Sequence, residues 1–162
     1  ITISFDDLVN VIDEIGGVTV FISEEEAAYY RENGMPDIEA GDVTLTGSQA
    51  LAHARNRTLG NDFERTRRQR SVIYGIYRKI MEKKDPSALM PLINYAVNHV
   101  KTNMGVSDMY DMAKDVMSVD NLKMQQTCIP QEGTYTDITY EGMQVLQVDF
   151  DANKKIIEQL LY

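Results

Sequence analysis

The sequence contains little cysteine and no long apolar run. Its single cysteine, Cys128, excludes an internal disulfide and a cysteine-ligated metal cluster. Cys128 lies in the apolar stretch Thr127-Cys128-Ile129, so we expect a buried structural thiol. No run of about eighteen apolar residues occurs, and no charged-then-apolar leader is visible, so we expect no membrane-spanning segment.

Several catalytic signatures are also missing. The sequence has no glycine-rich phosphate loop and no metal-ligand spacing, so we expect no metal ligands. Neither His53 nor His99 has a serine or cysteine at the spacing of a nucleophile and its base. His53 follows an alanine-rich turn, where a packed histidine is expected. The nine methionines lie at core-like positions and indicate packing.

Length and composition are typical of one globular domain. The chain has 162 residues, 43% of them hydrophobic and 25% charged, which is enough to build a hydrophobic core. The first residue is Ile1 rather than Met, and Ile1-Thr2-Ile3 is already typical of a strand. We therefore expect a piece of a longer gene product that starts inside a domain.

The hydrophobic pattern predicts one α/β domain with helices packed on a mixed sheet. A helix from the Ser4 cap to Ile15, ended by Gly16 and Gly17, lies between strands at 1–3 and 18–22, which indicates a βαβ crossover and a partly parallel sheet. Residues 23–41 are expected to form a loop with one helical turn around 24–32. The remaining expected strands are 43–45, 122–129 and 145–148, and the remaining helices are 48–54, one capped by Asn61 with Glu64 in a capping box and running to 84, one from Pro86 to 100, one capped by Ser107, and 150–162.

Positive charge is concentrated in one segment of an acidic chain. The formal net charge is -9, yet ten of the sixteen Lys and Arg residues lie between Arg55 and Lys84 with three acids, so this segment is near +7 and the remainder near -16. Six arginines fall between Arg55 and Arg70. A guanidinium offers a planar fork of donors that matches phosphate oxygens, so the concentration indicates a local anion site.

The expected helix from Asn61 has a polar beginning and an apolar continuation. Arg65, Arg68, Gln69 and Val72 lie three or four residues apart and share a face, which Ile76 continues. Such a face suits a phosphate head at the helix start with an apolar tail running along it. Arg55 and Arg57 can approach the same anion from the other side, and Asp62 can orient a guanidinium or ligate a metal.

A simpler interpretation is a solvated helix face paired with the protein's many acids. Arg67 and Arg70 belong to that face under either interpretation. Val72, Ile73, Ile76 and Ile80 fit a tail-binding surface or plain core equally well.

Several motifs are more specific than charge. Phe5-Asp6-Asp7-Leu8-Val9 with Ile15-Gly16-Gly17-Val18 is followed by Leu45-Thr46-Gly47-Ser48-Gln49-Ala50-Leu51, then by Arg55-x-Arg57 and Asp62-Phe63-x-Arg65-x-x-Arg68-Gln69. This order and spacing resembles the LytR-CpsA-Psr family. Ile129-Pro130-x-x-Gly133-Thr134-Tyr135 is similar to the family's late loop before its final strand and helix.

The resemblance implies an enzyme, an extracytoplasmic phosphotransferase that moves a teichoic acid or capsule glycopolymer from a polyprenyl pyrophosphate carrier to peptidoglycan with Mg²⁺. The implied fold is a three-layer α/β/α sandwich with a mixed central sheet and a lipid-binding cavity. By position, Arg55, Arg57, Arg65 and Gln69 would contact the pyrophosphate, and Asp62 would support the arginines. Arg68 matches the motif and is grouped with the substrate-binding residues, as are Val72 and Ile76.

The resemblance also sets the expected boundaries. Residues 1–162 would be the carboxyl-terminal portion of a single LytR-CpsA-Psr domain, and the family's metal-binding acids, another arginine and its membrane anchor would lie in an amino-terminal part outside this chain. This chain alone would then be an incomplete enzyme of the cell envelope. The family commonly has tyrosine where this chain has His53.

Two other functions stay open at this point. One is a non-catalytic envelope module that holds polyprenyl phosphates, and the other is a transcriptional attenuator, a role in the family's older descriptions. A net charge of -9 and the lack of a recognisable reading motif argue against nucleic acid as a partner.

Overall fold

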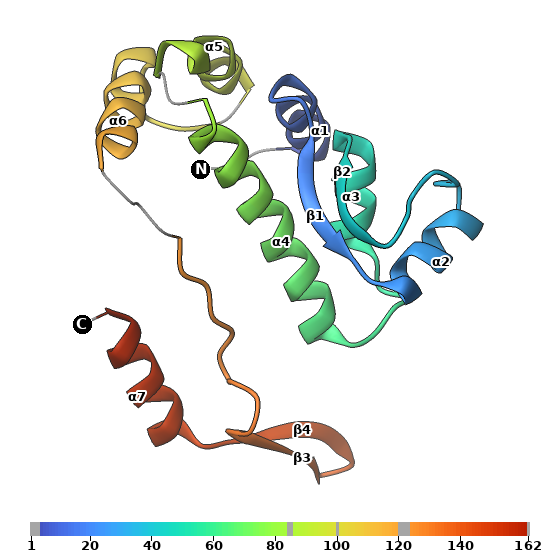
Figure 1. Cartoon of the computed structure of the whole chain (residues 1–162). Coiled ribbons are helices and arrows are strands. Elements are labelled where there is room, and N and C mark those ends of the chain that lie inside the picture. The colour runs from blue at the N-terminus through green and yellow to red at the C-terminus, as the bar shows by residue number, and fades with distance from the viewer. Residues whose placement is uncertain (1–3, 84–85, 100, 120–123, 162) are drawn as a thin grey trace. The chain divides into compact units, whose positions relative to one another are not determined.

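The computed structural model describes residues 4–83, 86–99, 101–119 and 124–161. The chain forms two compact units, Ile1–Lys123 and Met124–Tyr162. The first unit combines a pair of strands with helices before, between and after them, which confirms the α/β class (Figure 1). Both described sheets are antiparallel pairs, and the strand expected at 1–3, which would make the sheet partly parallel, lies outside the described residues.

The first helix, α1 (Phe5–Glu14), begins and ends as the sequence predicts. The Ser4 side chain accepts the Asp7 backbone N–H at 3.1 Å, and the chain then leaves the helix through Gly16 and Gly17, both at positive φ. A Cβ on Gly17 would lie 2.7 Å from the Leu45 carbonyl oxygen. Glycine therefore lets the start of the next strand approach its neighbour closely.

The two strands of the first unit pair with each other and contribute one buried face to its core. β1 (Val18–Ile22) pairs antiparallel with β2 (Gly41–Leu45), with Val18 opposite Leu45. Val18, Val20 and Ile22 are buried on one face of β1, as the alternation of a half-covered strand requires. The buried cluster comprises Ile12, Ile15, Val18, Val20, Ile22, Ala27, Tyr30, Ile38, Leu45, Ala50 and Val72.

Between the strands lies α2 (Glu24–Glu32), a nine-residue helix where the sequence predicted a loop with one helical turn. Ser23 and Glu26 form a capping box: each side chain accepts the other residue's backbone N–H. Ala27 and Tyr30 of this helix are buried. Its apolar face thus consists of few residues among many acids, which is why the sequence pattern did not predict the helix.

Two further helices bring the arginine segment onto the core. α3 (Gly47–Arg55) packs against α1 so closely that a Cβ on Gly47 would lie 2.2 Å from the Val9 carbonyl oxygen. α4 (Asp62–Met81) packs along β1 and α3 (Figure 1). Val72 is buried against the core, and a Cβ on Gly75 would meet the Thr19 carbonyl oxygen at 3.1 Å.

The start of α4 partly follows the expected capping box. The Asn61 side-chain oxygen accepts the N–H groups of Phe63 and Glu64, at 3.0 and 3.1 Å, so the predicted cap is confirmed. A capping box would also have the Glu64 carboxylate accept the Asn61 backbone N–H. The Glu64 carboxylate instead pairs with Arg67 Nε at 2.8 Å.

The first unit ends in a short 3-10 helix η1 (Pro86–Leu89), α5 (Met90–His99) and α6 (Val106–Ser118). The sequence predicted Ser107 as the cap of the last helix, and the structure places the cap at Gly105 instead. The Asp108 carboxylate accepts the Gly105 N–H at 2.9 Å, which fixes the earlier start.

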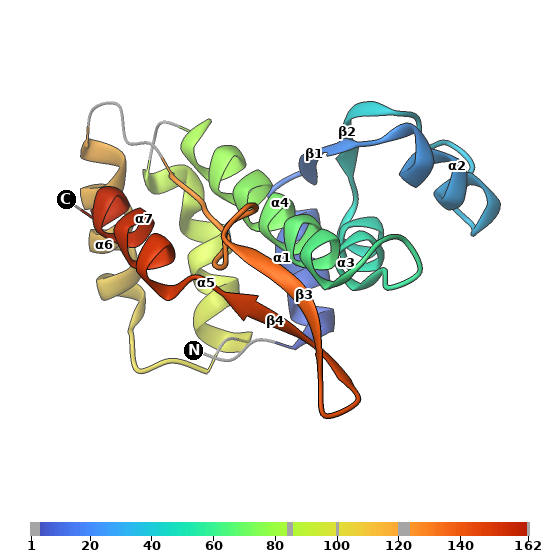
Figure 2. The ribbon, with the colours of Figure 1, turned by 90° about the horizontal axis from the view of Figure 1, so that it is seen from below.

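The second unit is a hairpin followed by a helix, as Figure 2 shows. β3 (Tyr135–Tyr140) pairs antiparallel with β4 (Met143–Val148), and α7 (Phe150–Leu161) follows. The sequence missed β3. Its strand at 122–129 is wrong for 124–129, which form no strand, while 122 and 123 lie outside the described residues. Cys128 is half-buried rather than buried. No described helix combines the length and apolar character needed to cross a membrane.

Candidate functional site

Arg55 and Arg57 lie at the end of α3 and in the loop that follows it. The Asn56 side-chain oxygen accepts the N–H groups of Thr58 and Leu59, at 2.8 and 3.2 Å, and so closes loop 56–59. The Tyr29 hydroxyl donates to the Thr58 hydroxyl at 3.3 Å, which ties the loop to α2. The backbone that carries the two arginines is thus fixed from both sides.

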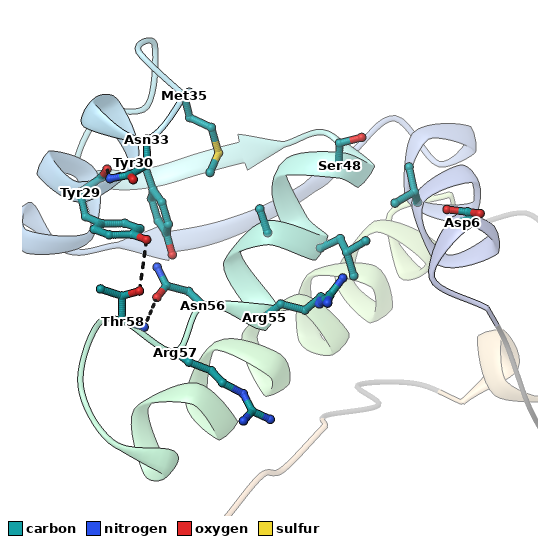
Figure 3. A pocket seen from close by; sticks show the side chains of 13 residues that line it. Asp6, Tyr29, Tyr30, Asn33, Met35, Ser48, Arg55, Asn56, Arg57 and Thr58 are labelled. Atoms are coloured by element: carbon teal, nitrogen blue, oxygen red, sulfur yellow. Dashed lines mark hydrogen bonds between the residues drawn. The ribbon is translucent and has the colours of Figure 1, made fainter.

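Both arginines are exposed and line one pocket of about 650 Å³ (Figure 3). The Arg55 guanidinium lies 4.8 Å from the centre of the Phe5 ring, a cation–π contact, whereas the described residues offer Arg57 no ion-pair partner. The pocket is lined by Asp6, Val9, Tyr29, Tyr30, Asn33, Met35, Ser48, Leu51, Ala52, Arg55, Asn56, Arg57 and Thr58. Two exposed guanidinium groups on one pocket suit an anion with several oxygens.

Asp62, Arg65 and Gln69 lie on the first two turns of α4 and are not among the residues lining that pocket. Asp62 and Arg65 form an ion pair at 2.5 Å, with Asp62 83% exposed. The Gln69 amide donates to the Ala54 carbonyl oxygen at 3.4 Å, which ties this part of α4 to the last turn of α3. The fold therefore brings Gln69 beside the α3 end that carries Arg55.

Arg68 is in a different environment from the other motif arginines. Only 1% of it is exposed, and its guanidinium donates to the carbonyl oxygens of Asn56 and Leu59, at 2.9 and 2.8 Å. A second nitrogen, Nη1, lies 3.4 Å from Glu26 Oε1. Arg68 is therefore buried with both Nη atoms directed at the protein's own backbone and Glu26, and its grouping with the substrate-binding residues stays a prediction.

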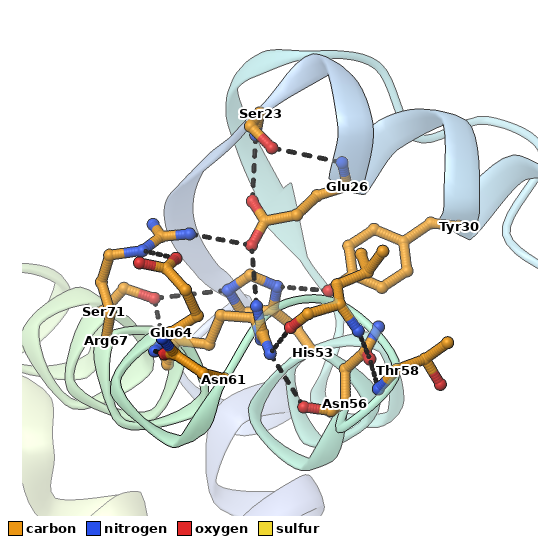
Figure 4. Close-up of polar contacts among 12 residues, drawn as sticks. Ser23, Glu26, Tyr30, His53, Asn56, Thr58, Asn61, Glu64, Arg67 and Ser71 are labelled. Atoms are coloured by element: carbon orange, nitrogen blue, oxygen red, sulfur yellow. Dashed lines mark hydrogen bonds and ion pairs between the residues drawn. The ribbon is translucent and has the colours of Figure 1, made fainter. Parts of the chain in front are cut away.

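Glu26 is the acid that the sequence analysis overlooked. It is 3% exposed and accepts from Arg67 at 2.9 Å as well as from Arg68 (Figure 4). Burial raises the pKa of Glu26, but the Ser23 backbone N–H and the charge of Arg67 outweigh this, so its pKa lies below the ordinary value. Glu26 is ionised at neutral pH. Arg67, predicted to belong to a solvated face, is only 39% exposed because of this pair.

His53 is packed, as the sequence predicts, and is neutral at neutral pH. It is 1% exposed, and burial, with the charges of Arg68 and Arg67, lowers its pKa to about 4 although Glu26 opposes the shift. The Ser71 hydroxyl donates to the Arg68 carbonyl oxygen at 2.7 Å and so accepts from His53 Nε2 at 3.4 Å. His53 Nδ1 then accepts the Tyr30 hydroxyl at 2.8 Å (Figure 4). His53 adds no positive charge to the arginine cluster.

A second, apolar cavity of about 470 Å³ lies along the other half of α4, among η1, α5 and α6. Ile73, Ile76 and Ile80 line it, whereas Val72 is 3% exposed in the core. For Val72 the plain-core interpretation therefore holds. The cavity's other residues are Tyr77, Met81, Leu89, Leu92, Ile93, Ala96, Thr102, Met104, Met109, Met112, Ala113 and Val116. Met112, 52% exposed, corrects the view of all methionines as core.

The described residues contain no group of three or more His, Cys, Asp or Glu side chains able to hold a metal ion. Asp62 is the acid nearest in sequence to the motif arginines, and its carboxylate is occupied by Arg65. These residues do not by themselves fit a magnesium site.

The charge pattern signalled the arginines but gave no sign of Glu26, Tyr29 or Asn56. The Ser23-x-x-Glu26 spacing is visible in the sequence, but it explains Glu26 fully as a helix cap. Its burial beside two arginines, 41 and 42 residues further on, comes only from the tertiary structure.

The chain belongs to the LytR_cpsA_psr family, whose model matches residues 1–161 and thus spans both units. It is 28% identical over 163 residues to the polyisoprenyl-teichoic acid–peptidoglycan teichoic acid transferase TagU of Bacillus subtilis, covering 99% of this chain and 50% of that protein. The Bacillus licheniformis TagU is 32% identical over 114 residues, 69% of this chain and 36% of that protein. The chain spans about half the length of the curated relatives it matches.

Solved structures share the fold. The structure of TagT bound to LIIa-WTA matches with a TM-score of 0.69 and 21% identity, covering 98% of this chain and 58% of that one. At this identity the likeness shows the fold alone, an α/β fold of the same family as that predicted from the motifs.

Proposed function

We propose that this chain is part of a cell-envelope phosphotransferase that moves an anionic glycopolymer from a polyprenyl pyrophosphate carrier to peptidoglycan. Its TagU relatives are named as teichoic acid transferases, which favours teichoic acid over capsule as the polymer. The proposed location is the outer face of the cell membrane, with the membrane anchor and the rest of the domain supplied by the amino-terminal part that the resemblance implies.

One observation carries the proposal: the first unit holds both an arginine pocket, lined by Arg55 and Arg57, and an apolar cavity along the carboxyl-terminal half of α4. Arg65, on α4 outside that pocket, and Ile76 in the cavity are eleven residues apart, or about 16 Å along the helix axis. A polyprenyl pyrophosphate has the same two parts, an anionic head and an apolar tail. Burial of the tail and pairing of the head would each contribute to binding.

The arginines would act on the pyrophosphate by neutralising charge. Arg55, Arg57 and Arg65 provide fixed cations, Gln69 an amide donor, and Asp62 holds Arg65 in place. A sugar hydroxyl of peptidoglycan attacks the phosphorus nearer the glycopolymer, the bond from that phosphorus to the bridging oxygen breaks, and polyprenyl phosphate leaves and takes up the proton that the hydroxyl loses. Fixed cations stabilise the negative charge on the leaving phosphate, and no protein nucleophile is required.

Magnesium is part of this proposal only as the cofactor that the family resemblance implies. The described residues do not supply a ligand set, so the steps above rest on the arginines alone.

The proposal is tested by binding of farnesyl pyrophosphate, with and without Mg²⁺, to the full-length protein and to its Arg55→Ala, Arg57→Ala variant. Each charge-assisted contact contributes roughly 1.5–3 kcal/mol, so we expect the double variant to lose at least about a hundredfold in affinity. Arg78→Ala removes an exposed arginine of α4 outside the pocket and should bind as the wild type does.

Equal binding by wild type and double variant would return these arginines to a solvated face. Binding without transfer of polymer to peptidoglycan by the full-length protein would instead support the non-catalytic envelope module. Salt-dependent binding of duplex DNA, abolished by the same variant, would support the transcriptional attenuator.

A further inference from the structure

Loop 56–59 carries Arg57 to the pocket, and two of its carbonyl oxygens accept hydrogen bonds from one buried side chain. Arg68 Nη2 donates to the carbonyl oxygen of Asn56 at 2.9 Å and to that of Leu59 at 2.8 Å. These two residues bracket Arg57 and Thr58. One nitrogen atom therefore holds both ends of the short loop, and Arg57 lies between the two fixed points.

The guanidinium of Arg68 is itself fixed. Arg68 is 1% exposed, and Glu26, 3% exposed, accepts from it at 3.4 Å while its other carboxylate oxygen accepts the Ser23 N–H at 3.0 Å. The chain of contacts runs from the capping box of α2 through Glu26 and Arg68 to the backbone around Arg57.

The buried pair of Arg68 and Glu26 adds little net stability. Burying an ion pair costs about as much in desolvation as the attraction returns, unless every donor is satisfied. Arg68 Nε is buried and finds no hydrogen-bond partner among the described residues. What the pair does supply is geometry, because Glu26 orients the planar guanidinium through Nη1 and so points Nη2 at the two carbonyl oxygens.

We propose that Arg68, held by Glu26, is a positioning residue for Arg57: it fixes loop 56–59 so that the exposed Arg57 guanidinium is presented to the pyrophosphate. This inference rests on the proposed function. Arg68 does not touch the anion, and its effect on binding passes through Arg57. Lysine cannot replace it, since its one nitrogen cannot stand both at the Nη1 position beside Glu26 and at the Nη2 position between the two carbonyl oxygens.

The test is a double-mutant cycle on farnesyl pyrophosphate binding to the full-length protein. We expect Arg68→Lys to weaken binding about tenfold, the effect of losing one well-placed charge-assisted contact. If Arg68 acts through Arg57, the Arg57→Ala, Arg68→Lys double variant binds no more weakly than Arg57→Ala alone. In the matched cycle with Arg55→Ala, the losses multiply, because Arg55 ends α3 outside the loop.

Losses that multiply in the Arg57 cycle, or wild-type affinity in Arg68→Lys, would overturn the inference. Glu26→Gln provides a milder second variant if Arg68→Lys does not fold, and Glu25→Gln, an exposed acid of the same helix, is its control.

A ligand-free measurement separates this inference from the proposed function. The Thr58 and Leu59 amides are hydrogen-bonded to Asn56, so their hydrogen exchange reports whether the loop is held. Exchange should be faster in Arg68→Lys and Glu26→Gln than in wild type or Glu25→Gln. Unchanged exchange overturns the positioning role. A further outcome is possible: exchange is faster in the two variants, but the wild-type protein does not bind farnesyl pyrophosphate. That result overturns the proposed function and the pyrophosphate role of Arg57 together.

Discussion

Arg57 and Arg68 show that residues of one motif can have opposite physical roles. Arg57 is exposed on a pocket without a described ion-pair partner, whereas Arg68 is buried with two carbonyl oxygens and a carboxylate around it. A guanidinium that binds an external anion must keep its donors free, and one that braces a loop must commit them. The same residue type thus occurs exposed on a pocket and buried against backbone within eleven positions.

At the residue scale, His53 makes stability depend on pH. Its folded pKa of about 4 lies below the ordinary 6.5, so between these values the unfolded chain binds a proton that the folded chain does not. The free energy of unfolding therefore falls as the pH drops through this window. We expect a decrease of about 2 kcal/mol from pH 7 to pH 5, measured by urea unfolding.

Two variants separate this effect from other titrations. His53→Gln should flatten the dependence between pH 7 and 5, while His99→Gln, which changes the exposed histidine paired with Asp7, should retain it. Glu26 and Asp7 have lowered pKa values. The stability that their ionised forms add is therefore lost only as the pH falls below their ordinary values of 4.5 and 3.8, outside this window. The same slope in both histidine variants would contradict the assignment.

At the scale of elements, α4 serves two surfaces because its residues face different neighbours. Val72 and Gly75 face the core and β1, Ile73 and Ile80 face the apolar cavity, and Asp62 and Arg65 lie at the polar amino end. Loop 56–59 lies in the connection from α3 to α4, so the packing of these two helices determines where the ends of the loop lie. Helix packing in the first unit is therefore a condition for the arginine pocket.

The contact between α1 and α3 is the closest packing of this kind. A Cβ on Gly47 would lie 2.2 Å from the Val9 carbonyl oxygen, which belongs to helix backbone and cannot rotate away as a side chain could. We expect Gly47→Ala to destabilise the protein by about 1–3 kcal/mol or more through overpacking, measured as a lower midpoint of urea unfolding.

Gly105→Ala is the matched control. A Cβ there meets only an ordinary contact at 3.6 Å, so the loss should be limited to the few tenths to one kcal/mol of a weakened helix cap. Equal losses in the two variants would show that close approach of α1 and α3 is not what requires glycine.

At the scale of the whole molecule, the arginine pocket and the apolar cavity both belong to the first unit, which is built on one antiparallel strand pair. The family match nevertheless spans both units. A lipid pyrophosphate that used both the pocket and the cavity would bind more tightly as its tail lengthens, until the cavity is filled.

A charge in the cavity tests that expectation. Met112→Asp should remove the gain in affinity from farnesyl to geranylgeranyl pyrophosphate, because a carboxylate disfavours burial of the added apolar tail. Val119→Asp places the same charge on a residue that is 51% exposed and lies outside the cavity, and it should keep the gain. A tail-length dependence that survives Met112→Asp would separate the cavity from lipid binding. Binding is measured by calorimetry on the full-length protein.

Local signals predicted the elements well where one residue or one period decides them. Ser4, Asn61 and the glycine pair at 16 and 17 mark helix ends through their own backbone chemistry, and the structure agrees. Prediction was wrong where a competing side chain decided the matter, as with Asp108, which moves the start of α6 from Ser107 to Gly105. β3 was missed because its strand is half polar and pairs with a neighbour that only the hairpin brings beside it.

The sequence by itself determined most of the helices and the first strand pair, the concentration of positive charge and, through spaced motifs, the family. Each of these depends on residue identity and local order along the chain. Only the tertiary structure decided which arginines are buried and which are free. Glu26 and Arg68 meet across 42 residues of sequence, and their burial depends on how α2, α3 and α4 pack. The sequence names a buried arginine and an exposed one in the same way, and only the surroundings in the folded protein distinguish them.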